Sequence, residues 1–164
     1  MFPKEIEKIA HLNFEDSRGN LSVILEGPLA GNSIALKRSM SNKGVFRGMH
    51  YQNSSSPQTK YVEVISGKIV DFVMCMNSLS KNYGQIYSEI ITPGITVRIP
   101  GDYAHGFYCH EETMFQYITD GKYSEIDEIV ISLDGETLRK HNVNDSHMIV
   151  SNKDAKGIRY TDYF

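Results

Sequence analysis

The sequence predicts an all-β fold, with a jelly roll or related β-barrel and short peripheral helices as the leading architecture. Short runs of β-branched and aromatic residues, each ended by a tight turn, follow one another through the centre of the chain. Helical periodicity of any length is missing, and no internal repeat or low-complexity linker divides the 164 residues. We therefore expect residues 1–164 to form a single domain that carries the whole function.

The central strands begin with a hairpin. Residues 60–65 ("KYVEVI") and 68–76 ("KIVDFVMCM") are rich in β-branched and aromatic side chains, and they flank Ser66 and Gly67. A serine-glycine pair between two such runs favours a tight turn that pairs them.

The same alternation of short strands and tight turns continues along the chain. A Thr-Pro-Gly turn and a Pro-Gly turn separate further apolar runs, whose residues are 85–91, 95–99, 105–109 and 113–119. Only residues 3–9 and residues 134–142 ("DGETLRKHN") are expected to hold a turn or two of helix. The mouth of the resulting barrel is the natural place for a pocket.

Composition argues against several classes of partner. Lys and Arg number 17 against 20 Asp and Glu, a formal net charge of −3, and no basic run marks a nucleic-acid surface. The first 20 residues carry carboxylates and no apolar stretch long enough for a signal peptide or membrane span. We therefore predict a cytoplasmic protein that binds neither nucleic acid nor membrane.

The two cysteines, Cys75 and Cys109, lie in apolar, strand-like segments without a CxxC spacing. Such thiols are typical of small core residues in a reducing compartment. The sequence therefore predicts neither a disulfide nor a structural zinc.

Five polar side chains interrupt the apolar strands: His50, Lys60, Asp71, His105 and Tyr117. Alternation along a strand allows His50 to face the barrel interior, and it places Lys60 on the same face as Val62 and Val64. Each residue alone has an ordinary structural explanation, as a hydrogen-bonded core histidine, a snorkelling lysine or a turn cap. Their occurrence together favours a functional site.

The order and spacing of several motifs identify a relative of this chain. "GVFRGMHYQ" (residues 44–52), "QTKYVEVISGKIVDF", "IPGDYAHGF", "FQYITDGKY" and "SNKD" occur in this order. Together they resemble the dTDP-4-dehydrorhamnose 3,5-epimerase family of cupin-fold sugar-nucleotide epimerases, over nearly the whole chain. The resemblance implies a homodimer that uses no cofactor or metal and inverts C3, C5 or both of a nucleotide-diphosphate-linked 4-keto-6-deoxy sugar.

The expected chemistry needs a base, a partner for an enolate oxygen and an acid. His50 suits the base, because a neutral imidazole accepts protons at physiological pH, and the resemblance makes Asp154 the carboxylate that orients it. Lys60 would pair with the enolate oxygen, and Tyr117 would return a proton on the opposite face. The remaining hydrogen bonds around Lys60 and the ketone are assigned to Asp71 and His105.

Five further residues are expected to bind the substrate: Arg18, Arg47, Gln52, Tyr123 and Lys37. The two arginines match the family's arginine positions and suit diphosphate oxygens, although Arg18 in "DSRGN" equally fits an ordinary turn. Tyr123 would stack on the base.

The chain also departs from the family pattern. The register of the family's "QxN" segment places Ala35 and Lys37 where that family has amides, and its second aspartate in "DxxxD" is Cys75 here. We therefore expect substrate recognition to differ from the family's pattern.

Three alternatives stay open. A cupin ketoisomerase that moves a keto group between C3 and C4 uses similar proton transfers, but its motif is typically "RGxHAH", unlike the His-Tyr-Gln of this chain. A metal-dependent cupin generally presents HxH with a downstream Glu. A sugar-binding module without turnover would be expected to lack His50 or Tyr117, and both are present.

Overall fold

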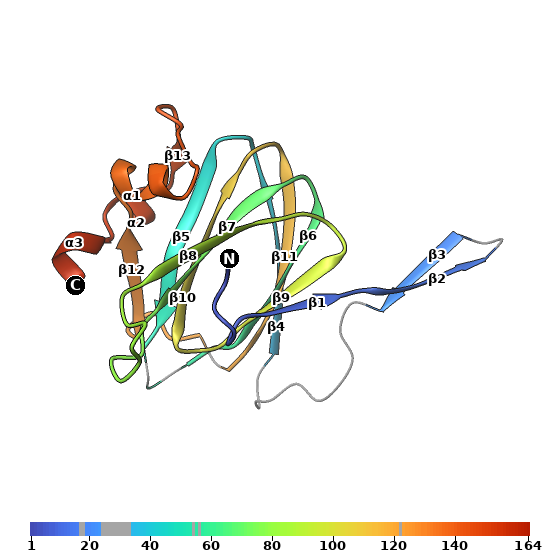
Figure 1. Ribbon diagram of the computed structural model, residues 1–164, viewed down its shortest axis with the longest axis horizontal. Coiled ribbons are helices and arrows are strands. Elements are labelled where there is room, and N and C mark those ends of the chain that lie inside the picture. Colours follow the sequence, from blue (N-terminus) through green and yellow to red (C-terminus); the bar gives the residue numbers. More distant parts are fainter. Residues whose placement is uncertain (17–18, 24–33, 54, 56, 122) are drawn as a thin grey trace.

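The computed structural model describes the chain except for residues 17–18, 24–33, 54, 56 and 122. It confirms the all-β prediction, because two large β-sheets face each other to form a jelly-roll barrel and the helices are few and short (Figure 1). In the part of the chain that is described, no helix is long and apolar enough to cross a membrane.

One wall of the barrel is a five-stranded antiparallel sheet. Its strand order is β1-β9-β6-β11-β4. The strands are β1 (Glu7–Ala10), β9 (Ile95–Ile99), β6 (Lys60–Ser66), β11 (Thr113–Asp120) and β4 (Ile34–Ser41).

The facing wall is a seven-stranded sheet that follows the path β14-β12-β5-β10-β7-β8, with β13 pairing beside β5. The strands are β14 (Ile158–Arg159), β12 (Glu128–Ser132), β5 (Val45–Gln52), β10 (Tyr103–Cys109), β7 (Ile69–Cys75), β8 (Ile86–Ile91) and β13 (Ile149–Val150). The predicted pairing of the two strands around Ser66 and Gly67 is wrong, because β6 and β7 belong to different sheets. The turn between them connects the two walls.

The main core lies between the sheets and follows the period-2 pattern of the strands. Val62 and Val64 on β6 are buried in it together with Val73 on β7, while Glu63 points to the outer face. The predicted face for Lys60, Val62 and Val64 is therefore the inner one.

A second core covers the outer face of the seven-stranded sheet. Met49 on β5 and Leu138 on α1 are buried in it, and the carboxyl-terminal elements pack over this side of the sheet (Figure 1). The helices are α1 (Gly135–Lys140), α2 (Asn152–Ala155) and α3 (Tyr160–Tyr163). The helix predicted within residues 134–142 is confirmed.

The helix considered for residues 3–9 is wrong. Residues 4–5 form a turn, and β1 begins at Glu7, which pairs with Arg98 on β9. The hydrogen bonds of a sheet edge replace those of a short helix there, because a helix of one or two turns has little intrinsic stability.

A hairpin and two cysteines complete the description of the strands. The hairpin of β2 (Leu12–Asp16) and β3 (Gly19–Val23) projects away from the two large sheets (Figure 1). Cys75 and Cys109 are free and buried, in β7 and β10.

Strands β5 and β10 approach each other unusually closely at two glycines. A Cβ on Gly48 would lie 2.6 Å from the Gly106 Cα, and a Cβ on Gly106 would lie 2.7 Å from the Arg47 carbonyl oxygen. Next to this contact, the register places His50 directly opposite His105 and shifts between His105 and Phe107. The glycines thus let two site histidines sit side by side.

Candidate active site

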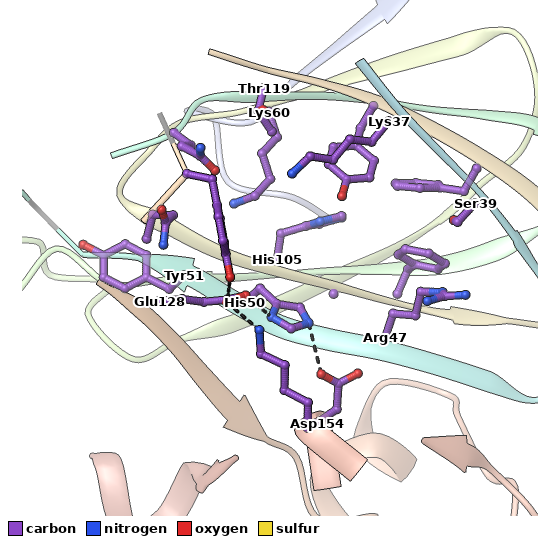
Figure 2. Close-up of a pocket in the computed structure, with 18 of the residues that line it drawn as sticks. Lys37, Ser39, Arg47, His50, Tyr51, Lys60, His105, Thr119, Glu128 and Asp154 are labelled. Atoms are coloured by element: carbon purple, nitrogen blue, oxygen red, sulfur yellow. Dashed lines mark hydrogen bonds and ion pairs between the residues drawn. The ribbon is translucent and has the colours of Figure 1, made fainter. Parts of the chain in front are cut away.

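A cavity of about 330 Å³ opens between the facing sheets, and residues from both sheets and from α2 line it. Lys37, Lys60 and Tyr117 enter from the five-stranded sheet, whereas His50 and His105 enter from the seven-stranded sheet. Figure 2 shows Lys37 and Lys60 across the same space from His50. These five predicted site residues therefore line one cavity at the barrel mouth.

His50 lies between two carboxylates. Its Nε2 is 3.1 Å from Asp154 Oδ1, and its Nδ1 is 2.9 Å from Glu128 Oε1 (Figure 2). Only the imidazolium carries two N–H groups and can donate to both carboxylates at once. The two carboxylates therefore fix the orientation of the ring, and in the neutral form one of its two nitrogens is free to accept a proton.

Asp154 owes its position to the start of helix α2. The Ser151 hydroxyl accepts a hydrogen bond from the Asp154 amide at 3.1 Å and caps the helix, while Asp154 Oδ2 accepts the Gly48 amide at 3.3 Å. Burial alone would raise the pKa of Asp154, but the hydrogen bond from His50, its positive charge and the Gly48 amide lower it below the ordinary value. The carboxylate stays ionised beside the imidazole.

Glu128 and Lys153 are two site residues that the sequence reading missed. Glu128 Oε2 accepts hydrogen bonds from Lys153 Nζ at 2.5 Å and from the Tyr123 hydroxyl at 2.6 Å. These contacts lower the pKa of Glu128 although burial opposes them. The available signals were a carboxylate at the start of an apolar strand and a lysine directly before Asp154.

The opposite wall carries Lys60 and Tyr117. Lys60 pairs with Thr119 across β6 and β11, so that Tyr117, two residues earlier on β11, shares its inward face. Burial, with a smaller contribution from Lys37, lowers the pKa of Lys60 to about 8, against the opposing charge of Glu128. Burial also raises the pKa of Tyr117, which favours its neutral, proton-donating form.

His105 and Asp71 form a buried pair on neighbouring strands. His105 Nε2 lies 2.6 Å from Asp71 Oδ1, and the Asp71 side chain is fully buried. His105 lines the cavity, whereas Asp71 lies behind it and fixes the orientation of the imidazole ring. Among the described residues, Asp71 Oδ2 has no hydrogen-bond partner.

Arg47 stands at the Ser39 end of the cavity (Figure 2). Its Nε donates to the Ser41 hydroxyl at 2.9 Å, and no ion pair joins it to a carboxylate among the residues that are described. Ser39 also lines the cavity, and its buried hydroxyl has no partner among those residues. A guanidinium and a hydroxyl that lack an anionic partner suit an anionic ligand.

Three of the other four predicted substrate contacts also line this cavity. Gln52 and Tyr123 both line the cavity, but the Gln52 amide is bonded at both ends to the Ser124 backbone, at 2.8 Å each, and so holds the segment that carries Tyr123. Lys37 also reaches the cavity. Arg18 lies outside the described residues.

Comparisons of the sequence with known proteins all match the same family. Residues 8–162 match the family model described as dTDP-4-dehydrorhamnose 3,5-epimerase. The chain is 29% identical over 129 residues to a protein of that name from Shigella flexneri, covering 76% of this chain and 70% of the relative. It is 33% identical over 103 residues to one from Methanothermobacter thermautotrophicus, covering 57% of this chain and 55% of the relative.

Solved structures agree with the fold. A dTDP-4-dehydrorhamnose 3,5-epimerase from Elizabethkingia anophelis superimposes with a TM-score of 0.85 at 25% identity, covering 97% of this chain and 93% of that one. A dTDP-6-deoxy-D-glucose-3,5-epimerase from Legionella pneumophila, solved with dTDP-4-keto-L-rhamnose, superimposes with a TM-score of 0.84 at 25% identity. The match covers 98% of this chain and 90% of that one. The similarity therefore extends over nearly the whole architecture.

Proposed function

The chain belongs to the dTDP-4-dehydrorhamnose 3,5-epimerase family, and we propose that it inverts C3, C5 or both of a nucleotide-diphosphate-linked 4-keto-6-deoxy sugar. Its class of chemistry is nucleotide-sugar epimerisation in deoxysugar biosynthesis, an isomerase reaction. One observation carries the proposal: His50 and Tyr117 enter one cavity from facing sheets. Inversion requires proton removal on one side of the sugar ring and proton delivery on the other.

The first step is proton abstraction. His50 acts as the neutral imidazole: one ring nitrogen stays bonded to Asp154, and the other, released from Glu128, takes the proton from the carbon beside the ketone. The electrons of the broken C–H bond form the enolate, and Asp154 stabilises the imidazolium. Lys60 pairs its ammonium with the enolate oxygen inside the cavity. His105, held by Asp71, completes the polar surroundings of the ketone.

The second step is reprotonation from the facing sheet. Tyr117 donates its phenolic proton to the enolate carbon, and the O–H electron pair remains on the tyrosine oxygen. The new C–H bond then points toward the five-stranded sheet, so the configuration of that carbon is inverted.

Binding of the nucleotide diphosphate is assigned to the end of the cavity that holds Arg47. The guanidinium and the Ser39 hydroxyl supply donors for phosphate oxygens there. Tyr123, at the Gln52 end of the cavity, supplies an exposed ring on which the base can stack. Binding energy from this remote part of the substrate positions the sugar between His50 and Tyr117.

A homodimer is part of the proposal. The outer face of the five-stranded sheet exposes large apolar side chains at Leu36, Met40 and Ile65, and the β2–β3 hairpin extends away from the sheets (Figure 1). A second copy of the chain would cover such a face.

We further propose that residues 1–164 act as one epimerase domain and that the enzyme works in the cytoplasm.

Proton exchange tests the proposed function. The protein is incubated in D₂O, without added metal, with freshly made 4-keto sugars on dTDP, GDP, CDP and UDP carriers, and NMR follows label at C3 and C5. Label at one or both carbons together with the inverted sugar supports the proposal, whereas transfer of the keto group to C3 supports a ketoisomerase. His50→Asn is the control, because it removes the base and should abolish exchange while leaving dTDP binding nearly intact.

A further inference from the structure

The Lys37 ammonium lies between two tyrosine rings at the wall opposite His50. Its Nζ is 5.7 Å from the centre of the Tyr117 ring and 5.5 Å from that of Tyr123. The β4–β11 register pairs Lys37 directly with Tyr117, and the Tyr123 hydroxyl donates to Glu128, which fixes the second ring. No ion pair with a carboxylate engages Lys37 among the described residues.

Tyr117 needs a nearby cation if it is the acid of the reaction. When its proton leaves, the phenol becomes an anion in a partly buried position, and burial raises the pKa of Tyr117. Arg47 on β5 lowers this pKa and Glu128 on β12 raises it. The cation on the strand beside Tyr117 is Lys37.

This inference rests on the proposed function: we propose that Lys37 is a positioning residue that stabilises the tyrosinate form of Tyr117 during reprotonation. As the phenolic O–H bond breaks and the C–H bond forms, the electron pair remains on the Tyr117 oxygen. The Lys37 ammonium lies over the face of that ring, 5.7 Å from its centre, and so lies near the charge as it develops. Both rings hold the ammonium in place by cation–π attraction before the charge develops.

The positive charge of Lys37 also acts on Lys60, whose ammonium form it disfavours. Lys37 adds to the lowering of the Lys60 pKa, because the two ammonium groups repel each other in the cavity. The enolate oxygen at Lys60 and the tyrosinate at Tyr117 are the negative charges that offset this repulsion during turnover. Lys37 thus contributes most when the second proton is transferred.

The test compares Lys37→Gln, which removes the charge, with Lys37→Arg, which keeps it. Exchange of solvent deuterium reports the His50 step and appearance of the inverted sugar reports the Tyr117 step, both by NMR in D₂O. An opposite charge within about 4–6 Å changes a pKa by about 1–3 units, and one unit corresponds to about tenfold. Lys37→Gln should therefore lower inversion by about tenfold relative to exchange, and Lys37→Arg should restore the ratio.

Two results would overturn this role. If Lys37→Gln lowers exchange and inversion equally and weakens dTDP binding, Lys37 is a phosphate ligand; an unchanged ratio with unchanged binding likewise contradicts it. Because Lys37 is exposed to solvent, the variant should keep the wild-type circular dichroism spectrum. A wild-type protein that exchanges no 4-keto nucleotide sugar contradicts the proposed function itself, so the two failures are distinguishable.

Discussion

Asp154 connects helix α2 to strand β5 through both of its oxygens: Oδ1 lies 3.1 Å from His50 Nε2, and Oδ2 accepts the Gly48 amide at 3.3 Å. The carboxylate is thus fixed by the backbone two residues before the histidine it orients. Rotation of the imidazole ring would break the contact with Asp154 and the one with Glu128.

Asp154→Asn should lower the rates of exchange and inversion by about 10²–10⁴, because the amide cannot stabilise the imidazolium by charge. Binding of dTDP should be nearly unchanged, since the residues assigned to the nucleotide lie elsewhere in the cavity. Steady-state NMR rates and calorimetric titration with dTDP check the two parts. A loss of dTDP binding equal to the loss of rate would show that Asp154 supports the whole pocket.

Tyr117→Phe should separate the two proton transfers. His50 can still remove a proton and return one on its own side, so label should enter the substrate from D₂O far faster than the inverted sugar forms. The pocket keeps its aromatic ring and loses only a hydroxyl. An NMR time course at C3 and C5 measures both rates, and a parallel fall in the two would remove Tyr117 from the role of acid.

Lys60 should impose an upper pH limit on the reaction. Burial and the nearby Lys37 charge lower its pKa to about 8, so the ammonium is present below that pH and is lost as the pH rises through it. In the free enzyme, kcat/KM should therefore decline above about pH 8. Lys60→Arg keeps a cation at all these pH values, so its slower reaction should lack the decline. The same decline in both proteins would assign it to another group.

Gly106→Ala should destabilise the barrel near the site. The added methyl group would meet the Arg47 carbonyl oxygen at 2.7 Å and the Gly48 Cα at 3.2 Å, so β5 and β10 must separate. We expect a loss of about 1–3 kcal/mol, as for other overpacked sites, measured by chemical denaturation. Gly135→Ala is the matched control, because its Cβ would approach only the flexible Arg139 side chain at 3.4 Å. Equal stability of the two variants would contradict the close packing of these strands.

Local sequence patterns were sufficient for much of the fold. The period-2 alternation placed Lys60 with Val62 on the inner face, and the turn residues separated the strands that the structure contains. The motifs around His50 and His105 placed both histidines at the cavity, although nothing local indicates that they are direct neighbours across β5 and β10.

Long-range pairing determined what the sequence reading missed. Glu128 reaches His50 because β12 pairs with β5, and Lys153 reaches Glu128 because α2 packs beside the same sheet. Neither contact follows from spacing along the chain. The error at residues 3–9 has the same origin, since the strand there forms by pairing of Glu7–Ala10 with the distant β9.

The placement of His50 and Tyr117 on facing sheets has a consequence for how new specificities arise. The separation between two packed sheets is set by the side chains of the core, at about 10 Å, and not by the residues that contact a ligand. Positions at the cavity rim, such as Lys37 and Ser39 on edge strand β4, can therefore diverge without altering the distance over which protons enter and leave. The reaction can therefore stay the same while residues at the rim change to suit different sugars. Core substitutions that change the separation between the sheets should lower the turnover rate before they lower the affinity for substrate.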